Sequence, residues 1–260
     1  MGLPAMKLQY DGPLTIATAG SRKSVSWKNQ DVSWGELAAR LATPLKTAET
    51  QDEYNAMRKA QKDDIKDVGG FVGGALKNGR RKAESIIHRS LVTLDIDSVP
   101  QGEDPWEIVT LVIGCAAILY STHSHSPKAP RLRLVIPLSR KVTPDEYAAL
   151  SRRIAGDIGI DMCDDTTYEA HRLMYWPSHS IDGEYRFEIQ DGLWLDVDEQ
   201  LARYKDWHDV SEWPVSSRKT EIMRRLAKKQ GDPLEKPGVV GAFNRVYSIE
   251  DAIDQFLPEV

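Results

Sequence analysis

The feature that most constrains this chain is an apolar run, residues 90–97 (SLVTLDID), that ends in two carboxylates. Because side chains alternate across a β-strand, Asp95 and Asp97 are expected on one face, with Leu94 and Ile96 on the other. Two carboxylates at the end of a buried strand repel each other unless a cation lies between them. The pair therefore predicts a site for Mg²⁺ or Mn²⁺, which take oxygen ligands, and a solvated strand end is the alternative.

Charge and cysteine content narrow the classes of protein to consider. The 260 residues carry a net charge of −5, whereas a protein that binds only phosphate backbones is usually basic. A role on nucleic acid therefore needs a local basic patch or bridging metal ions. The two cysteines, Cys115 and Cys163, form neither a zinc site nor a disulfide framework. No run is long enough to span a membrane and no signal peptide is recognisable, so we expect a cytoplasmic protein.

Periodicity, turn and capping signals divide the chain into expected strands and helices. Strands are predicted at residues 86–96, 131–138 and 172–176, with a strand end at 119–122 and hairpins at 14–27 and between 186–189 and 193–197. Helices are predicted at residues 33–41, 105–119, 143–157 and 211–230, with a weak helical period over 48–63. Residues 237–257 are predicted as a glycine-containing segment followed by a further helix. Residues 68–74 predict a glycine-rich loop.

A basic cluster follows that glycine-rich segment: Lys77, Arg80, Arg81 and Lys82. The spacing of Gly74 and Gly79 resembles that of a P-loop, but the next residues are not Lys-Ser or Lys-Thr, and no apolar strand precedes it. A flexible loop is favoured instead. Its cluster could hold a nucleoside triphosphate or a template strand, or it could be a solvated face.

Polar residues flank the turn before the second strong strand. Ser121, His123 and His125 could donate hydrogen bonds to a phosphate, and a polar turn is the alternative. A zinc site is disfavoured because no Asp-His pair follows the histidines. After the turn, a period of two places Arg131 and Arg133 on one face of their strand.

Those two arginines need anions. Asp95 and Asp97 could supply them through salt bridges across the sheet. A bound triphosphate could also do so, because the planar guanidinium bonds phosphate bidentately.

An acidic loop at residues 160–170 could add a third carboxylate, from Asp161, Asp164 or Asp165. A two-metal centre needs ligands that span ions about 3.5–4 Å apart, which three carboxylates from two segments can provide. Taken alone, an Asp-Asp pair usually marks a turn or a helix cap.

Taken in order, these motifs resemble the primase-polymerase (prim-pol) domain of the archaeo-eukaryotic primase superfamily, in the form found in phage and plasmid replication proteins. The residues that carry the resemblance are 94–97, then 122–127 with 130–133, then 164–168 with 172–178. It covers roughly residues 10–200 of the chain.

The resemblance implies an α+β fold with a two-part catalytic core, an α/β unit plus a sheet unit like an RNA-recognition motif, with the active site between them. The core would occupy residues 1–205. Residues 206–260 would form a helical C-terminal segment, and the part around 233–257 resembles the linker toward a helicase domain that this chain does not contain.

The resemblance also implies roles for residues. Asp95 and Asp97 would bind the catalytic metals and Asp164 would complete the site, with Asp165 and Asp161 as alternatives. The residues that would bind the nucleotide are Ser121, His123, His125, Arg131, Arg133 and Arg172. Which of the histidines and strand arginines contacts the triphosphate stays open, because the arginines occupy the return strand where the family often carries its histidine. The cluster Lys77, Arg80, Arg81 and Lys82 would receive DNA.

The implied activity is DNA-dependent nucleotidyl transfer by a primase or DNA polymerase. It would use two Mg²⁺ or Mn²⁺ ions, NTP or dNTP substrates, a single-stranded DNA template and a primer, and possible partnership with a replicative helicase. No membrane role is expected, and a phage-encoded protein would act in the host cytoplasm. A metal-dependent nuclease or phosphohydrolase and a non-catalytic DNA-binding replication module are the alternatives. Sugar preference, de novo priming, template preference and oligomeric state stay open.

Overall fold

The computed structural model describes residues 4–230 and 238–256 of the chain. The chain divides into two compact units, Met1–Val215 and Ser216–Val260, so residues 206–215 belong with the first. The first unit is α+β and the second holds the helices α7 (Ser217–Gln230), α8 (Gly238–Val246) and α9 (Ile249–Phe256). The predicted fold class is confirmed. None of the helices in the described residues is both long and apolar enough to cross a membrane.

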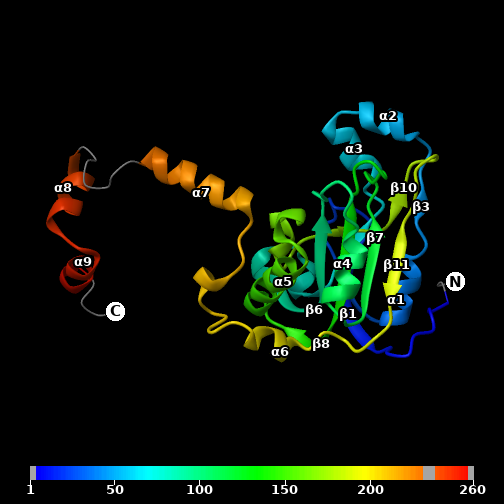
Figure 1. The fold of residues 1–260 in the computed structure, drawn as a ribbon, viewed down its shortest axis with the longest axis horizontal. Helices are drawn as coiled ribbons and strands as arrows, with labels where there is room; N and C mark the ends of the chain where they lie inside the picture. The colour runs from blue at the N-terminus through cyan, green and yellow to red at the C-terminus, as the bar shows by residue number, and fades with distance from the viewer. Residues whose placement is uncertain (1–3, 231–237, 257–260) are drawn as a thin grey trace. The chain divides into compact units, whose positions relative to one another are not determined.

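The larger of the first unit's sheets has five antiparallel strands in the order β11-β7-β8-β6-β5. Its strands are β5 (Gly74–Leu76), β6 (Ile86–Ile96), β7 (Ala117–Ser121), β8 (Leu132–Val142) and β11 (Phe187–Gln190). Helices α4 (Pro105–Val112) and α5 (Pro144–Ile158) cover one face (Figure 1). On that face Leu94 and Ile96 share a core with Leu150 and Ile154, so the predicted alternation along β6 is confirmed. The order β6-α4-β7-β8-α5 follows the βαββα pattern of ferredoxin-like folds.

The second sheet has four strands in the order β2-β1-β4-β9. Its elements are β1 (Pro13–Ala19), β2 (Lys28–Ser33), β4 (Gly70–Val72), β9 (Met174–Tyr175) and the helix α1 (Trp34–Leu41). Ser33 and Glu36 form the predicted capping box at the start of α1. Leu37 and Phe71 from this part pack with Leu91 and Val135 of the larger sheet, so a second core lies between the two sheets.

The remaining elements are short. They are β3 (Leu45–Lys46) paired with β10 (Ser178–His179), the helices α2 (Gln51–Ala56), α3 (Lys59–Ile65) and α6 (Val197–Ala202), and the 3₁₀ turns η1 (Lys77–Gly79), η2 (Ala83–Ser85), η3 (Ile160–Met162), η4 (Asp165–Tyr168) and η5 (Val210–Glu212). The weak helical period over 48–63 corresponds to α2 and α3.

The glycine-rich segment is strand rather than loop, which corrects the prediction for residues 68–74. Gly73 alone separates β4, in the four-stranded sheet, from β5, in the five-stranded sheet. A Cβ atom at Gly73 would lie 2.9 Å from the Cβ of Leu91 and 3.0 Å from Nη2 of Arg89. The glycines are therefore needed for close packing where one segment crosses between the sheets.

The predicted helix at 105–119 ends early, at Val112, and residues 117–121 form the buried strand β7. Gly114 lies between them with φ +60°, a conformation that stops a helix. The apolar run misled the prediction because a buried strand and a buried helix look alike in periodicity.

Both predicted hairpins also differ in the structure. In the first hairpin, the strand that pairs with β1 is residues 28–33 rather than the predicted segment ending at Trp27. The backbone N–H of Trp27 donates to the carbonyl of Gly79. That return strand is polar and lies at a sheet edge, so it lacks an apolar alternation. At the second, β11 pairs with β7, and residues 193–197 contribute only the isolated bridge of Leu195 to Leu138.

Candidate active site

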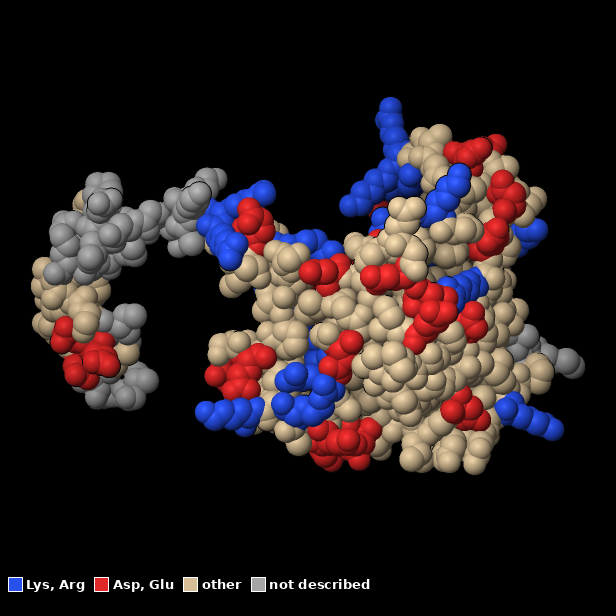
Figure 2. Space-filling model, viewed as in Figure 1, with Lys and Arg blue, Asp and Glu red and all other residues tan. Residues whose placement is uncertain are grey.

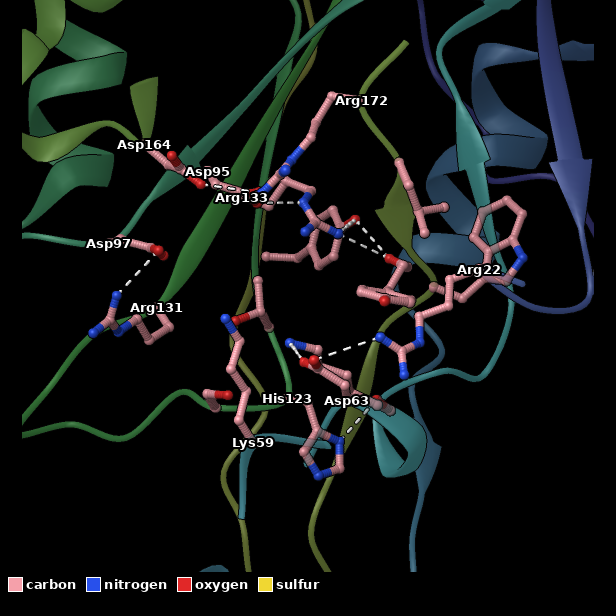
Figure 3. A pocket seen from close by; sticks show the side chains of 18 of the residues that line it. Arg22, Lys59, Asp63, Asp95, Asp97, His123, Arg131, Arg133, Asp164 and Arg172 are labelled. Carbon is pink, nitrogen blue, oxygen red and sulfur yellow. Dashed lines mark hydrogen bonds and ion pairs between the residues drawn. The ribbon is translucent and has the colours of Figure 1, made fainter. Parts of the chain in front are cut away.

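A cavity of about 880 Å³ opens where the ends of β6 and β7 meet the start of β8. These strand ends share one edge of the sheet because β8 is antiparallel to both of its neighbours. The turn between β1 and β2, helix α3 and the segment around β9 and β10 complete the border. Figure 3 shows Asp95, Asp97 and Asp164 together on one side, with Arg22 across the cavity.

We call the strand-end side the sheet wall; its charged residues are Asp95, Asp97, Arg131, Arg133, Asp164 and Arg172. Asp95 lies opposite Arg133 in the β6–β8 register, and Arg133 Nε donates to Asp95 Oδ1 at 2.7 Å. Arg131 Nη1 lies 3.1 Å from Asp97 Oδ2. The shared face predicted for each pair is confirmed, and the two arginines pair with the two carboxylates.

Asp164 reaches the sheet wall by pairing along the end of β6. An isolated bridge joins Cys163 to Ile96, and the backbone N–H of Asp164 donates to the carbonyl of Asp95 at 2.9 Å. Arg172 Nη2 donates to Asp164 Oδ2 at 3.1 Å. Asp164 is thus the acid of its loop that borders the cavity; Asp161 and Asp165 do not.

The three carboxylates influence one another electrostatically. Burial raises the pKa of Asp97, and the negative charges of Asp95 and Asp164 raise it further, although Arg131 opposes them. Burial works against the charge on Arg133, but Asp95 and Tyr120 hold the pKa of that guanidinium above its usual value. A cation added beside Asp97 would therefore relieve a repulsion that already exists.

The oxygen donors of the sheet wall fit a divalent cation by type, as Mg²⁺ and Mn²⁺ prefer carboxylates. Over residues 4–230 and 238–256, however, no group of three or more His, Cys, Asp or Glu is close enough to hold a metal ion. Each of the three carboxylates instead contacts an arginine. Each of these contacts uses one oxygen of its carboxylate, so a metal ion bound here would either share the acids with the arginines or displace them.

The opposite side of the cavity, the outer wall, consists of Arg22, Lys23, Lys59, Asp63 and Lys66. Arg22 and Lys23 both contact Asp64 at 2.9 Å, and Lys66 contacts Asp63 at 2.8 Å. Figure 2 shows several Lys and Arg side chains projecting together at the top of this view, near α3. Sequence reasoning missed this wall, because α3 has no apolar face and its only signal is charge.

The cavity as a whole is positive, although the chain is acidic. Its lining includes eight Lys or Arg side chains and four Asp side chains, whereas the chain carries a net charge of −5. Concentration of basic groups at a concave site favours an anionic ligand with several charges.

His123 lies at the floor, and both of its ring nitrogens already have partners. Nε2 lies 2.9 Å from Glu49 Oε1 and Nδ1 lies 2.9 Å from Ser178 Oγ. Burial lowers the pKa of His123, although the contact with Glu49 opposes this. A neutral ring that donates from Nε2 to the carboxylate must accept from the hydroxyl of Ser178. His123 is thereby oriented, and Ser178 was not found from the sequence.

Two other predicted nucleotide-binding residues do not line the cavity. Ser121 Oγ accepts from the backbone N–H of Arg186 at 2.9 Å, and His125 Nδ1 accepts from the backbone N–H of Arg131 at 3.2 Å. The His125 side chain thus supports the turn between β7 and β8, and the Ser121 side chain ties the end of β7 to the segment before β11. Their neighbours Thr122 and Ser124 border the cavity instead.

Of the basic cluster expected to receive DNA, Arg81 borders the cavity, and Lys77, Arg80 and Lys82 do not. Arg81 is half-buried, with its guanidinium 5.4 Å from the centre of the Trp27 ring. The other three are exposed.

Comparison with known proteins adds two matches. The family model described as VapE N-terminal domain matches residues 3–216. The AEP domain of the primase-polymerase (PrimPol) of cyanophage S-2L is similar in structure, with 13% sequence identity and a TM-score of 0.38 over 72% of this chain and 86% of that one. No curated protein matches the sequence. The family match supports the predicted prim-pol-like domain.

Proposed function

The chain belongs to the family of VapE N-terminal domains, and from that premise we propose that it is a primase-polymerase-like nucleotidyltransferase that acts on a single-stranded DNA template. The observation that carries the proposal is the cavity itself. Four carboxylates, three of them on the sheet wall, and eight basic side chains face one space, which suits a triphosphate with divalent cations.

The basic side chains would hold the triphosphate. Arg131, Arg133 and Arg172 lie beside the carboxylates, and a guanidinium bonds phosphate bidentately. Arg22 and Lys59 face them across the cavity and would neutralise charge on the phosphates farthest from the sheet. The terminal 3′-hydroxyl of a primer would attack the α-phosphorus, forming a P–O bond as pyrophosphate leaves and the hydroxyl loses its proton.

Asp95, Asp97 and Asp164 would hold the divalent cations. When bound, such cations lower the pKa of the attacking hydroxyl and stabilise the charge on the leaving pyrophosphate. Arg131 and Arg172, whose side chains are partly exposed, would turn from Asp97 and Asp164 toward the triphosphate, while the buried Arg133 would keep its bond to Asp95. Arg131 and Arg172 would then pair with carboxylates when no substrate is present and with phosphate when it is bound.

The ring of His123 is fixed by Glu49 and Ser178, so its part in the proposal is to hold the floor of the cavity in place rather than to contact phosphate. Thr122 and Ser124 supply hydroxyl groups beside it. Ions, substrate sugar and a helicase partner remain predictions from the resemblance.

A primer-extension assay tests the proposal. A labelled primer on a single-stranded template should lengthen when the protein is supplied with Mg²⁺ or Mn²⁺ and either dNTPs or NTPs. A parallel reaction without primer reports de novo synthesis. Release of phosphate or shortening of the strand without any extension would instead favour the phosphohydrolase or nuclease.

One observation favours a second candidate, a non-catalytic DNA-binding module. All three acids of the sheet wall are already paired with arginines, as in a purely structural network. If the wild-type protein binds single-stranded DNA but neither extends nor cleaves it with either metal, the module is the better description.

A further inference from the structure

A second cavity, of about 430 Å³, lies between α1 and the paired strands β1 and β2. Trp176 borders both this cavity and the candidate active site, so the two adjoin at that side chain. The volume falls in the range of about 300–1,000 Å³ typical of small-molecule sites.

The strand register explains which side chains line this second cavity. Gln30 lies opposite Ile16, and Thr18 and Val32 fall on the same face because a strand alternates with period two. Ile16 and Val32, with Leu37 of α1, give the cavity apolar walls. The helix covers this face incompletely, which leaves the space.

Two polar side chains in the cavity have hydrogen-bonding capacity to spare. Within residues 4–230 and 238–256, neither Thr18 nor Gln30 makes a side-chain hydrogen bond. A glutamine amide offers both a donor and an acceptor, which is the pairing that the edges of nucleobases present.

Trp176 and Arg40 form an aromatic and cationic border to the same cavity. Phe71 stacks on the Trp176 ring with centroids 4.9 Å apart, and the Arg40 guanidinium lies 5.0 Å from its centroid. Arg40 is exposed and this ring is its described contact, so a flat ligand can take its place or stack on it. Bases stack on tryptophan and on guanidinium planes in many single-strand binders.

The turn after β1 links the two cavities with positive charge. Gly20 borders the second cavity, while Arg22 and Lys23 border the candidate active site. A groove that carries basic groups for the backbone and an aromatic platform for bases is the usual design for binding single strands.

From this arrangement we infer that the cavity beneath α1 is a base-binding site for the single-stranded DNA template, with a base against Trp176 and its phosphates along the turn that carries Arg22 and Lys23. The inference rests on the proposed function for the identity of its ligand. It extends that function by a second site, outside the three carboxylates and the triphosphate.

The test measures the binding of a fluorescent oligodeoxythymidine of about 15 nucleotides by anisotropy, without nucleotides or primer. A second probe of the same length and charge carries abasic sites in place of its bases. Gln30→Trp fills the cavity from a half-buried strand position, and Arg40→Ala removes an exposed side chain at its border. Lys205→Ala, which removes one exposed charge outside both cavities, is the matched control.

We expect Gln30→Trp and Arg40→Ala to weaken binding of the base-bearing probe about tenfold. The abasic probe should bind all four proteins within about twofold of one another, and Lys205→Ala should behave as wild type with both probes. Equal binding of the base-bearing probe by wild type and both cavity variants would overturn the inference. So would an equal loss for both probes, because that result reports phosphate contacts alone.

Thermal unfolding of each variant checks that it is folded. Primer extension is measured separately, so the two proposals fail in different ways. Base-dependent binding through this cavity without primer extension would contradict the proposed function and support the base-binding site. Primer extension, together with unchanged DNA binding by the cavity variants, would support the proposed function and contradict the base-binding site.

Discussion

The sheet wall and the outer wall of the cavity differ in the balance of their charges and in how those charges are held. The sheet wall has three acids and three arginines, whereas the outer wall has four basic side chains and one acid. On the sheet wall the side chains of Arg133 and Asp95 are only 6% and 11% exposed and bond to each other across neighbouring strands. On the outer wall Lys23 and its partner Asp64, which lies beside the wall, are 67% and 57% exposed, while Arg22 and Asp63 are 27% and 20% exposed. Buried charges are fixed in place by their partners, whereas exposed ones can turn toward a ligand. We therefore expect the sheet wall to determine the geometry of the catalytic groups and the outer wall to determine the electrostatic attraction of nucleic acid.

The largest expected difference between the walls is in catalysis. Asp95→Asn keeps the size of the side chain and an oxygen for Arg133 but removes a metal-binding charge. Extension rates should fall by about 100-fold or more, since metal coordination contributes several kcal/mol. Asp63→Asn, the outer-wall counterpart, should change the rate by less than about fivefold. Equal losses in the two variants would remove the distinction between the walls.

Stability should separate the walls next. Arg133→Met leaves Asp95 buried without its cation, so the free energy of unfolding should fall by about 3–5 kcal/mol. Arg22→Met on the outer wall should shift the urea midpoint less, because its nearest partner, Asp64, is 57% exposed to water. Equilibrium unfolding in urea, followed by circular dichroism, measures both. A midpoint for Arg133→Met that matches wild type would contradict the prediction.

Attraction of nucleic acid should depend on the outer wall. Lys59→Ala should weaken oligonucleotide binding and lower the slope of log K against log salt by about 1, as for a lost phosphate contact. Arg131→Gln should change that slope less, because Asp97 already balances the arginine. A salt titration of binding measures both slopes. A larger change in slope for Arg131→Gln than for Lys59→Ala would contradict the assignment of nucleic-acid attraction to the outer wall.

The smallest expected effect concerns pH and the cavity floor. Burial lowers the pKa of His123 below its usual 6.5, so the unfolded chain takes up a proton before the folded chain does. Stability contributed by the neutral ring is present above that pH and is lost as the pH falls toward the folded-state pKa. The Tm should therefore drop on acidification below 6.5, and it should drop less in His123→Gln. Identical pH profiles for the two proteins would show that the ring does not titrate on unfolding.

The sheet wall could be predicted from the sequence because its information is local. A period of two placed Asp95 with Asp97, and Arg131 with Arg133, and the structure agrees. The register of β6 and β8 brings the two pairs together. The sequence did not decide whether the arginines pair with these carboxylates or with a bound triphosphate. The loop that delivers Asp164 depends on one bridge, from Cys163 to Ile96, which no local pattern announces.

The outer wall and the floor could not be predicted, because they are assembled from distant segments. Glu49 and Ser178 meet His123 from parts of the chain far apart in sequence, and nothing in the spacing of a single residue indicates such a contact. Charged residues on α3 look like any solvated helix face. His123 was predicted as a candidate from the sequence, but its role in the cavity floor follows from its contacts with Glu49 and Ser178.

The crossing at Gly73 has a consequence for how chains of this family can differ in length. One residue belongs to neither strand there, with β4 fixed in one sheet and β5 in the other. An inserted residue would turn the side chains of one strand to the opposite face while leaving the other unchanged. Both cores would then lose their fit. Sequences related to this one should therefore gain and lose residues freely in exposed loops such as 98–103, but keep a constant number between residues 70 and 76.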